Sequence, residues 1–483
     1  MFLEQPVGAL VCETVTATSM AELRAARDRA SDADLVELRL DGVADVSVAG
    51  ALAGRRRPVI ITCRPSWEGG RWTGFEAKRL ELLAEAFRLG AEYVDVEWRA
   101  DRRSLPVTDH TRLVLSHHDF HGVPTDLADR VRAMRAEYPG VLKVAVTTRR
   151  LTDCLVLRDA VAGGSDHLAI GMGPAGVVTR VWPAWLGSRW TYGGSAAPGQ
   201  LATKELIDTY RVRQTTSRTR TFGLTGAPLG HSASPAMHNA AFAALGWDAV
   251  YVPLETRDAE DFQTMADAIK LEGASVTAPL KEPLFVQADA TDGPAGDVRA
   301  INTLRRRRGR WEGRNFDVGG FLTPLTRRRV PLSGRRAVVV GAGGAARAAA
   351  WALRGAGAIV EISARRPERA RLLASALGAS TGTWPPAPGW DLLVNATPVG
   401  TWPNVEESPI ASAHLGGRLV YDLVYNPSET ALLRMARAAG LETIGGLEML
   451  VAQACLQCEW WTGGPAPASV MDRAARDAVA CAK

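Results

Sequence analysis

Short apolar runs alternate with helix-like stretches from residue 9 to about residue 210, at intervals of roughly 25 residues. Such an alternation is typical of strands and helices that follow one another in a parallel sheet. Eight runs can be counted, at residues 9–15, 35–40, 58–63, 92–98, 112–116, 141–147, 166–172 and 189–194. Eight parallel strands in about 200 residues predict a small (β/α)8 barrel, whose chemistry should gather at the carboxyl ends of the strands.

The pattern changes after the predicted barrel, which we place at residues 1–210. The polar stretch 211–221 lacks apolar periodicity and is predicted to be a linker. An α/β domain is predicted at 222–328. A second α/β domain at 329–445 opens with a valine-rich strand, a glycine turn and an alanine-rich helix. Residues 446–483 are predicted to be helices that return to the domain at 222–328.

Composition limits the classes of function. Hydrophobic residues make up 46% of the 483 positions and charged residues 23%, and no apolar run is long enough to span a bilayer. The N-terminus carries no export or organelle signal, so we expect a cytoplasmic protein without a membrane partner. Six cysteines are thinly spread and predict reduced thiols. Cys455 and Cys458 are spaced as neighbours on a helix, and no metal site is expected.

Charge gives little support for a nucleic-acid partner, because 57 basic residues stand against 52 acidic ones. The densest basic run, Arg305 to Arg308, lies between two strand-like segments and predicts a solvated hairpin tip. Lysine is rare among the basic residues. The chain has only Lys78, Lys143, Lys204, Lys270, Lys281 and Lys483. A lysine in so arginine-rich a chain is most useful where a titratable, nucleophilic amine is needed.

Lys143 lies inside the predicted strand 141–147. Strand alternation puts it on one face with Val141 and Ala145, and in a barrel that face can be the interior. Apolar walls would disfavour the ammonium ion, and the neutral amine can attack a carbonyl to form an imine. The alternative is a lysine that reaches solvent from a strand end.

Other polar residues follow the predicted strands. Arginines suit a carboxylated, hydroxyl-rich substrate, and a histidine paired with a carboxylate suits proton abstraction beside an imine. The alternative for each is a surface ion pair or a barrel salt bridge. The candidates are Glu37 and Arg39, then Arg64 and Glu68 after the third strand, and His117, His118 and His121 after the fifth.

Six motifs in fixed order make residues 35 to 200 resemble the type I 3-dehydroquinate dehydratases. They are E-x-R-x-D, R-x-S-x-E-G-G, S-x-H-D-F, the lysine strand, M-G-x-x-G-x-x-x-R and A-P-G-Q. The resemblance implies a (β/α)8 enzyme without a cofactor that converts 3-dehydroquinate to 3-dehydroshikimate. Lys143 would form the imine, His118 would act as general acid and base, and Glu68 would orient His118. The implied substrate-lining residues are Glu37, Arg39, Arg64, Met172, Arg180 and Gln200. Ala196 stands where the family usually has serine, next to Ser195.

A nucleotide site is indicated in the second half. Gly341 and Gly343 follow a strand and precede a helix, so the backbone can approach a pyrophosphate at the helix N-terminus. The next strand is followed by arginines instead of an acidic residue. Arg365, Arg366 and Arg369 would attract a 2′-phosphate and favour NADP over NAD. The alternative is three exposed arginines at a helix start.

Residues 222 to 470 resemble the shikimate dehydrogenases through G-A-G-G-A, N-A-T-P-x-G-x-W-P, V-Y-D-L-V-Y-N-P and Q-A-x-x-Q. The resemblance implies that Lys281 and Asp317 form a proton-transferring pair. The implied substrate-binding residues are Ser232, Ser234, Thr277, Asn302, Tyr425 and Gln453. The implied NADP-binding residues are Gly341, Gly343, Gly344, Ala345, Arg365, Arg366, Arg369, Asn395 and Thr397. Three positions depart from the family pattern: Arg365–Arg366 follow Ala364 in place of N-R-T, Ser275 replaces asparagine, and Phe316 replaces threonine.

The implied product of the first half is the implied substrate of the second, which favours one bifunctional enzyme. Its expected partners are the small molecules 3-dehydroquinate, 3-dehydroshikimate and shikimate, and we expect a monomer or a homodimer. Two alternatives stay open from the sequence. The second half could act mainly as an NAD-dependent quinate/shikimate dehydrogenase, or one half could be a metabolite-sensing module without catalysis.

Overall fold

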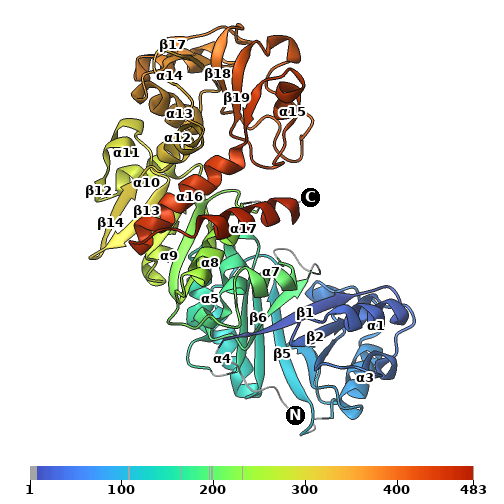
Figure 1. The fold of residues 1–483 in the computed structure, drawn as a ribbon. Helices are drawn as coiled ribbons and strands as arrows, with labels where there is room; N and C mark the ends of the chain where they lie inside the picture. Colours follow the sequence, from blue (N-terminus) through green and yellow to red (C-terminus); the bar gives the residue numbers. More distant parts are fainter. Residues whose placement is uncertain are drawn as a thin grey trace. The chain divides into compact units, whose positions relative to one another are not determined.

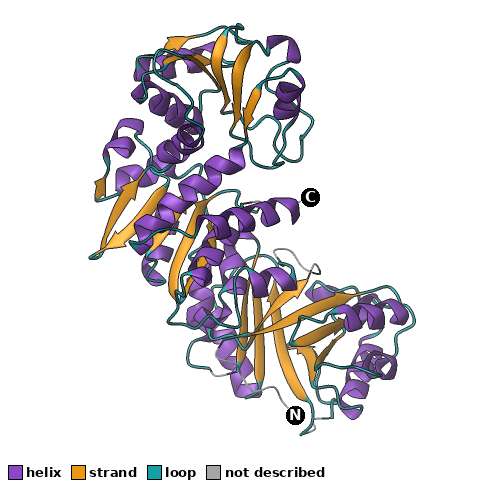
Figure 2. Ribbon diagram, viewed as in Figure 1, coloured by secondary structure: helices purple, strands orange, loops and turns teal. Residues whose placement is uncertain are grey.

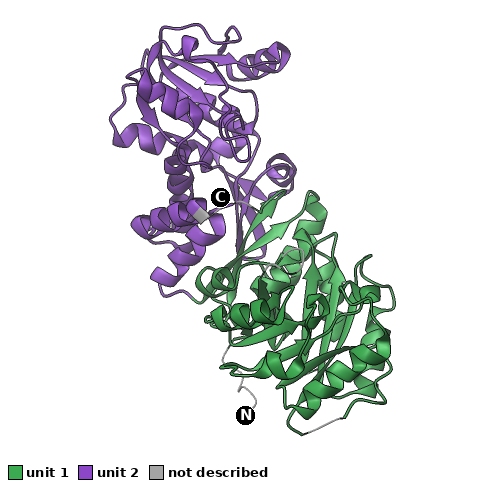
Figure 3. Cartoon of the chain, turned by 90° about the vertical axis from the view of Figure 1, so that its right-hand side faces the viewer, with its two compact units in different colours: residues 1–230, 248–271 green, residues 231–247, 272–483 purple. Residues whose placement is uncertain are grey.

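The computed structural model describes residues 8–106, 109–164, 166–194, 196, 200–230 and 232–481. The chain forms two compact units (Figure 3). Residues 1–230 and 248–271 make the first, and residues 231–247 and 272–483 make the second. The units do not follow the domain limits expected from the sequence, because residues 248–271 join the first unit. Those limits stay predictions.

The first unit is built around an eight-stranded parallel sheet that curls into a barrel (Figures 1 and 2). Neighbouring strands pair in the order β7-β6-β5-β4-β3-β2-β1-β8. The Arg189 amide donates to the His167 carbonyl at 3.0 Å and links the first and last strands of that order. The strands are β1 (Leu10–Thr16), β2 (Leu35–Arg39), β3 (Val59–Thr62), β4 (Tyr93–Glu97), β5 (Arg112–Asp119), β6 (Val141–Thr147), β7 (His167–Met172) and β8 (Trp190–Gly194). The predicted (β/α)8 barrel is confirmed.

Strand alternation divides the barrel's apolar side chains into two layers. Side chains such as Val36 and Leu38 pack outward against the helices, whereas Leu35, Tyr93 and Trp190 fill the interior. The barrel helices are α1 (Met20–Arg29), α2 (Val48–Leu52), α3 (Glu76–Arg88), α4 (Leu127–Glu137), α5 (Asp153–Val161), α6 (Val177–Val181) and α7 (Thr203–Asp208). A polar residue on an inward position of a strand is therefore held in an apolar shell.

The first unit continues beyond the barrel with β9 (Arg220–Gly226), β10 (Ala249–Glu255) and α9 (Ala259–Ala268). The two strands pair in parallel. The connecting stretch expected to be a linker packs against the barrel, since Val212 is buried and the Trp182 indole donates to the Thr216 carbonyl at 2.9 Å.

The second unit begins with a mixed α/β region. Its elements are α8 (Ser234–Ala244), β11 (Gly273–Val276), α10 (Lys281–Gln287), β12 (Ala290–Thr291), α11 (Gly293–Val298), β13 (Thr303–Arg307), β14 (Arg310–Arg314) and α12 (Asp317–Arg327). Strands β13 and β14 form an antiparallel hairpin that turns at Arg308 and Gly309, both with positive φ. The arginine-rich run is therefore a hairpin tip, as its sequence predicts.

A six-stranded parallel sheet follows, in the order β17-β16-β15-β18-β19-β20. Its order reverses at β15, and ligands of such sheets bind beyond the carboxyl ends of the strands at this point. The strands are β15 (Arg336–Val340), β16 (Ile359–Ser363), β17 (Ser380–Thr381), β18 (Trp390–Asn395), β19 (Gly417–Asp422) and β20 (Glu442–Ile444). The helices are α13 (Gly344–Gly355), α14 (Pro367–Leu377) and α15 (Ala431–Ala438).

Helices α16 (Gly446–Thr462) and α17 (Ala468–Cys481) end the chain. The Gln457 amide donates to the Thr303 hydroxyl at 2.8 Å, and the Trp461 indole donates to the Leu304 carbonyl at 3.0 Å. Helix α16 thus packs against β13. Within the described residues, no helix combines the length and apolar character needed to cross a membrane.

Candidate active sites

Lys143 points into the barrel and is only 5% exposed. Its Nζ lies 3.0 Å from Asp95 Oδ2 and 3.2 Å from Glu37 Oε1, and 4.4 Å from the centre of the Tyr192 ring. The inward orientation agrees with strand alternation. The expectation of apolar walls is wrong, because two carboxylates flank the amine within ion-pair distance.

The two carboxylates beside Lys143 are stabilised as anions. Burial alone would raise the pKa of Glu37, but the positive charges of Lys143 and Arg39 outweigh it and hold that pKa below its ordinary value. Burial also opposes ionisation of Asp95, yet Arg64 and Lys143 lower its pKa. The Thr14 and Thr62 hydroxyls donate to Glu37 at 3.0 and 2.9 Å. The lysine is therefore fixed by groups that stay charged.

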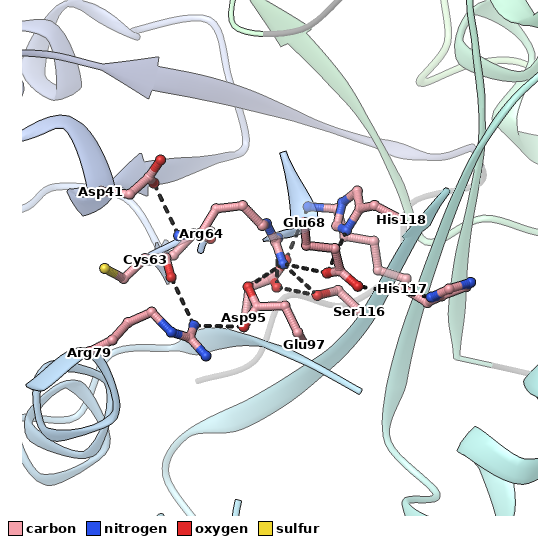
Figure 4. A network of polar contacts seen from close by, with 12 residues as sticks. Asp41, Cys63, Arg64, Glu68, Arg79, Asp95, Glu97, Ser116, His117 and His118 are labelled. Carbon is pink, nitrogen blue, oxygen red and sulfur yellow. Dashed lines mark hydrogen bonds and ion pairs between the residues drawn. The ribbon is translucent and has the colours of Figure 1, made fainter. Parts of the chain in front are cut away.

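Asp95 also belongs to a buried network centred on Arg64 (Figure 4). The guanidinium of Arg64 is 2.8 Å from Asp95 and 2.6 Å from Glu97. Arg79 is fully buried, lies 2.6 Å from the other Glu97 oxygen and donates to the Cys63 carbonyl at 2.9 Å. Arg64 was expected to line the substrate site, and most of its donors serve this network instead.

Glu68 and His118 face each other at the same end of the barrel (Figure 4). His118 Nδ1 lies 3.2 Å from Glu68 Oε2. His118 is on β5 itself, so the expectation that it follows the fifth strand is corrected by three residues of extra strand. Burial, with Arg64 and Lys143 nearby, lowers the pKa of His118 well below its usual value. Burial raises the pKa of Glu68 to about 8. Burial thus favours the neutral forms of both side chains, the imidazole of His118 and the carboxylic acid of Glu68.

The neighbouring histidines are placed differently: His117 Nδ1 is 3.9 Å from Glu68 Oε1 and makes no hydrogen bond to it. His117 is on the opposite strand face, 3.3 Å from Arg130, and burial lowers its pKa to about 4. The backbone amide of His121 donates to Asp119 at 2.9 Å in the turn that follows β5. The alternation of β5 separates His118 from the other two candidates.

Arg180 is a buried cation without a counter-ion. It is 3% exposed, no salt bridge to it occurs among the described residues, and its Nε has no hydrogen-bond partner there. Burial lowers the pKa of Arg180 to about 10, and burial is the only cause of this shift. An unpaired buried guanidinium is costly in free energy unless a ligand supplies an anion.

A pocket of about 120 Å³ collects the residues expected in the first site. Arg39 at its rim is oriented by a bidentate pair with Asp41, at 2.8 and 2.9 Å. Ala196 also lines the pocket, whereas Ser195 lies outside the described residues. The expected residues on its wall are Glu37, Arg39, Arg64, Glu68, His118, Lys143, Met172, Arg180 and Gln200.

Sequence reasoning missed the residues that support this pocket. Asp95 and Glu97 occupy alternate positions of β4, and both are fully buried. The sequence did contain a sign of them, because two acidic residues on one face of a predicted apolar strand are unusual. Ser116, which donates to Asp95 at 2.6 Å, is the serine of the S-x-H-D-F motif but was given no role there, and Arg79 belonged to no motif.

A second polar cluster lies in the second unit. Lys281 Nζ is 2.5 Å from Asp317 Oδ2, and the Asn302 amide donates to Asp317 Oδ1 at 2.8 Å and to Gln453 Oε1 at 3.3 Å. Lys281 opens α10 and Asp317 opens α12, so helix starts hold both partners. The structure brings together four residues expected to share a site.

The remaining substrate-binding candidates lie near element ends. Ser232 accepts from the Ser234 amide at 3.2 Å where α8 begins. Thr277 follows β11 directly, and Tyr425 packs in the apolar cluster of α8 and α16. Their contacts with a substrate stay predictions.

Ser275 and Phe316, two of the positions that depart from the family pattern, are part of the packing of this half. The Ser275 hydroxyl donates to Gln457 at 2.8 Å. Phe316 packs edge-on against Trp460, with ring centres 5.7 Å apart.

The glycine turn fits a dinucleotide phosphate. Gly341 has φ of +121°, and a Cβ there would lie 2.9 Å from the Ala396 carbonyl. Gly343 and Gly344 face open space, and Gly343 offers no side-chain cap to α13, which begins at Gly344 and continues with Ala345. The first amides of a 12-residue helix are therefore available to an anion.

Three arginines follow β16 beside this turn. Arg365, Arg366 and Arg369 are exposed, and none forms an ion pair within the described part of the chain. Their neighbour Arg371 pairs with Glu368 at 3.5 Å. The residues present thus fit a pyrophosphate and a further phosphate group.

Asn395 is placed differently from its expected role. It is fully buried, its amide donates to Asp422 at 2.8 Å, and its carbonyl accepts from the Thr397 amide and hydroxyl at 3.0 and 2.7 Å. The side chain shapes the turn after β18, and Thr397 is the more accessible of the two.

The chain matches three family models. Residues 11–217 match type I 3-dehydroquinase, residues 224–304 match the shikimate dehydrogenase substrate binding domain, and residues 446–476 match the shikimate 5'-dehydrogenase C-terminal domain.

Relatives cover the whole chain or its second half. A chloroplastic bifunctional 3-dehydroquinate dehydratase/shikimate dehydrogenase of Arabidopsis thaliana is 32% identical, over 95% of this chain and 83% of that protein. The shikimate dehydrogenase (NADP(+)) of Moorella thermoacetica is 41% identical over 55% of this chain and 96% of its own.

Solved structures agree for the second half. Shikimate 5-dehydrogenase from Thermus thermophilus, in complex with NADP(H) and shikimate, is 38% identical with a TM-score of 0.50, covering 54% of this chain and 99% of that one. Identity over most of the Arabidopsis protein places the two halves in one family. The chain belongs to the bifunctional 3-dehydroquinate dehydratase/shikimate dehydrogenases.

Proposed function

We propose that this chain dehydrates 3-dehydroquinate to 3-dehydroshikimate in the barrel and reduces that product to shikimate with NADPH in the second unit. The observation that carries the proposal is a single pocket in which Lys143, the Glu68–His118 pair and the unpaired Arg180 meet. A nucleophile, a base and an anion seat are what imine-assisted elimination from a carboxylated ketone needs. We infer matching domain limits of 1–210 for the dehydratase and 222–483 for the dehydrogenase.

The dehydratase steps use side chains alone. The Lys143 amine, after losing its proton, attacks the C3 carbonyl of 3-dehydroquinate, and water leaves as the imine forms. His118 removes a C2 proton, and the electrons of that C–H bond form an enamine. The C1 hydroxyl then leaves as water with a proton returned by His118, and hydrolysis of the imine releases 3-dehydroshikimate. Arg180 binds the substrate carboxylate throughout, because its buried guanidinium has no ion-pair partner among the described residues.

The imine is tested by reduction. Borohydride added with 3-dehydroquinate should leave a stable adduct on the peptide that contains Lys143, detected by mass spectrometry, because reduction fixes the carbon–nitrogen bond. The Lys143→Ala variant should give no adduct, and Lys204→Ala, which removes a lysine 78% exposed in its side chain, should label normally. Labelling on another lysine would contradict the mechanism.

The Glu68–His118 pair predicts a pH effect. Because burial raises the pKa of Glu68 to about 8, its carboxyl is protonated below that pH and ionised above it. The ionised form stabilises the imidazolium that arises when His118 takes the C2 proton. Dehydratase kcat/KM should therefore rise as pH increases through about 8, and Glu68→Gln should lose that rise. Parallel profiles for the two proteins would show that Glu68 does not titrate in this range.

In the second unit, Lys281 donates a proton to the carbonyl oxygen of 3-dehydroshikimate while the carbonyl carbon is reduced. Asp317 holds the ammonium 2.5 Å away, and Asn302 holds Asp317. When bound, NADPH supplies the hydride. Ser232, Ser234, Thr277, Tyr425 and Gln453 are proposed to bind the substrate.

Removing the Lys281 amine should separate the two activities. Lys281→Ala should lower NADPH-dependent reduction by about 10²- to 10⁴-fold, as expected for a lost general acid, and leave dehydration unchanged. Glu282→Ala, at the next and exposed position of α10, is the matched control. Equal loss of both activities would point to misfolding and would contradict the assigned role.

The cofactor is proposed to be NADP, held by Gly341, Gly343, Gly344 and Ala345 at the pyrophosphate and by the three free arginines at the 2′-phosphate. Asn395 would act by shaping the turn that presents Thr397.

Arg365→Ser should lower the preference for NADPH over NADH by about 10- to 100-fold in kcat/KM, since a charged hydrogen bond contributes about 1.5–3 kcal/mol. The control is Arg371→Ser on α14, whose guanidinium already pairs with Glu368. An unchanged cofactor ratio in Arg365→Ser, measured with shikimate or 3-dehydroshikimate, would refute the assignment.

A further inference from the structure

The turn that follows the lysine strand is completed by a carboxylate from far along the chain. In the turn Arg149–Thr152, the amides of Arg149 and Arg150 donate to Asp153 at 2.7 and 3.0 Å. The amides of the other two residues donate to Asp261 at 2.9 and 3.0 Å, and the Thr152 hydroxyl donates to it at 2.8 Å. Each amide of the turn has an anionic acceptor.

Asp261 comes from the dehydrogenase part of the sequence. It lies in the first turn of α9, inside the segment 224–304 that matches the shikimate dehydrogenase substrate binding domain. The turn it completes lies in the dehydroquinase match, 11–217. Both belong to the first compact unit (Figure 3). A residue of one enzyme's sequence thus completes a loop of the other enzyme's barrel.

The contact is buried and charged. Asp261 is 1% exposed. Burial would raise its pKa, but hydrogen bonds from Thr152 and Leu151 outweigh burial and lower the pKa. Arg150 adds an ion pair at 3.5 Å. An ionised carboxylate that accepts three hydrogen bonds away from water fixes the turn in place.

The turn is linked to the substrate pocket through Thr148. The Thr148 amide and hydroxyl both donate to the Met172 carbonyl, at 2.9 and 3.0 Å. A Cβ on Gly176 would lie only 2.6 Å from the Thr148 hydroxyl, so the loop after β7 packs closely on this residue. Met172 ends β7 and lines the pocket, and the loop that follows it leads into α6, which carries Arg180.

We propose that Asp261 is a positioning residue for the dehydratase reaction, which holds the segment from Met172 to Arg180 in the geometry that binds the substrate carboxylate. The inference rests on the dehydratase activity proposed above and extends it, because the dehydratase site then depends on a residue of the dehydrogenase sequence. Asp261 itself does not line the pocket that contains Lys143.

The test uses the full-length protein and compares Asp261→Ala with Glu260→Ala, the preceding exposed position of α9. Loss of the clamp should raise the KM for 3-dehydroquinate by about 10- to 100-fold with a smaller change in kcat, because Arg180 binds substrate and transition state alike. Asp261→Asn keeps one acceptor oxygen and should give an intermediate KM. Shikimate oxidation with NADP+ should match the unmodified protein in all three variants.

A double variant decides whether the effect passes through Arg180. In the Arg180→Ala background, Asp261→Ala should add little to the rise in KM, since the residue that it positions is gone. Full additivity would overturn the proposal, as would an unchanged KM in Asp261→Ala or an equal loss of both activities. If the unmodified protein itself fails to convert 3-dehydroquinate, the proposed function fails and not the clamp alone.

Discussion

The first site depends on pairing nearly all of the charge that is buried inside the barrel. Lys143, Arg64 and Arg79 face Glu37, Asp95 and Glu97, and the shortest of these contacts are 2.6 Å. Isolated charges there would cost far more free energy than the barrel's packing supplies. Two groups differ from the others. Burial raises the pKa of Glu68 to about 8 although Arg64 lies 3.5 Å from it, and Arg180 has no ion-pair partner among the described residues. Arg180 is available to bind the carboxylate of a substrate, and Glu68 is available for the proton transfer.

The two lysines work in opposite surroundings. Lys143 is held between carboxylates in the barrel interior and must lose its proton before it can attack a carbonyl. The side chain of Lys281 is 27% exposed and pairs with Asp317. This exposure suits a proton donor, because the lysine can regain its proton from solvent. The same residue type thus serves as a nucleophile and as an acid because its neighbours differ.

Periodicity in the sequence predicted the strands well, since β6 has the bounds that its apolar run indicates, and β7 and β8 differ from theirs by one residue. It also predicted that Lys143 faces inward, and the motif spacing selected the residues that line the pocket. Periodicity could not predict contacts between side chains that are far apart in the sequence. The support from Arg79 and Asp261 depends on side chains that meet only after the barrel has closed, and the apolar surroundings expected for Lys143 ignored the acids of β4. The motif around Asn395 led us to expect this side chain at the cofactor. In the structure its amide is buried and donates to Asp422.

The central claim is that one chain carries out two consecutive reactions. The most direct measurement adds 3-dehydroquinate and NADPH to the purified full-length protein, without any other enzyme, and follows the absorbance of NADPH together with the products. The account predicts oxidation of NADPH after a lag, with one shikimate formed for each NADPH consumed. Failure to consume NADPH, when the same preparation reduces added 3-dehydroshikimate, would contradict the dehydratase; accumulation of 3-dehydroshikimate without oxidation of NADPH would contradict the dehydrogenase.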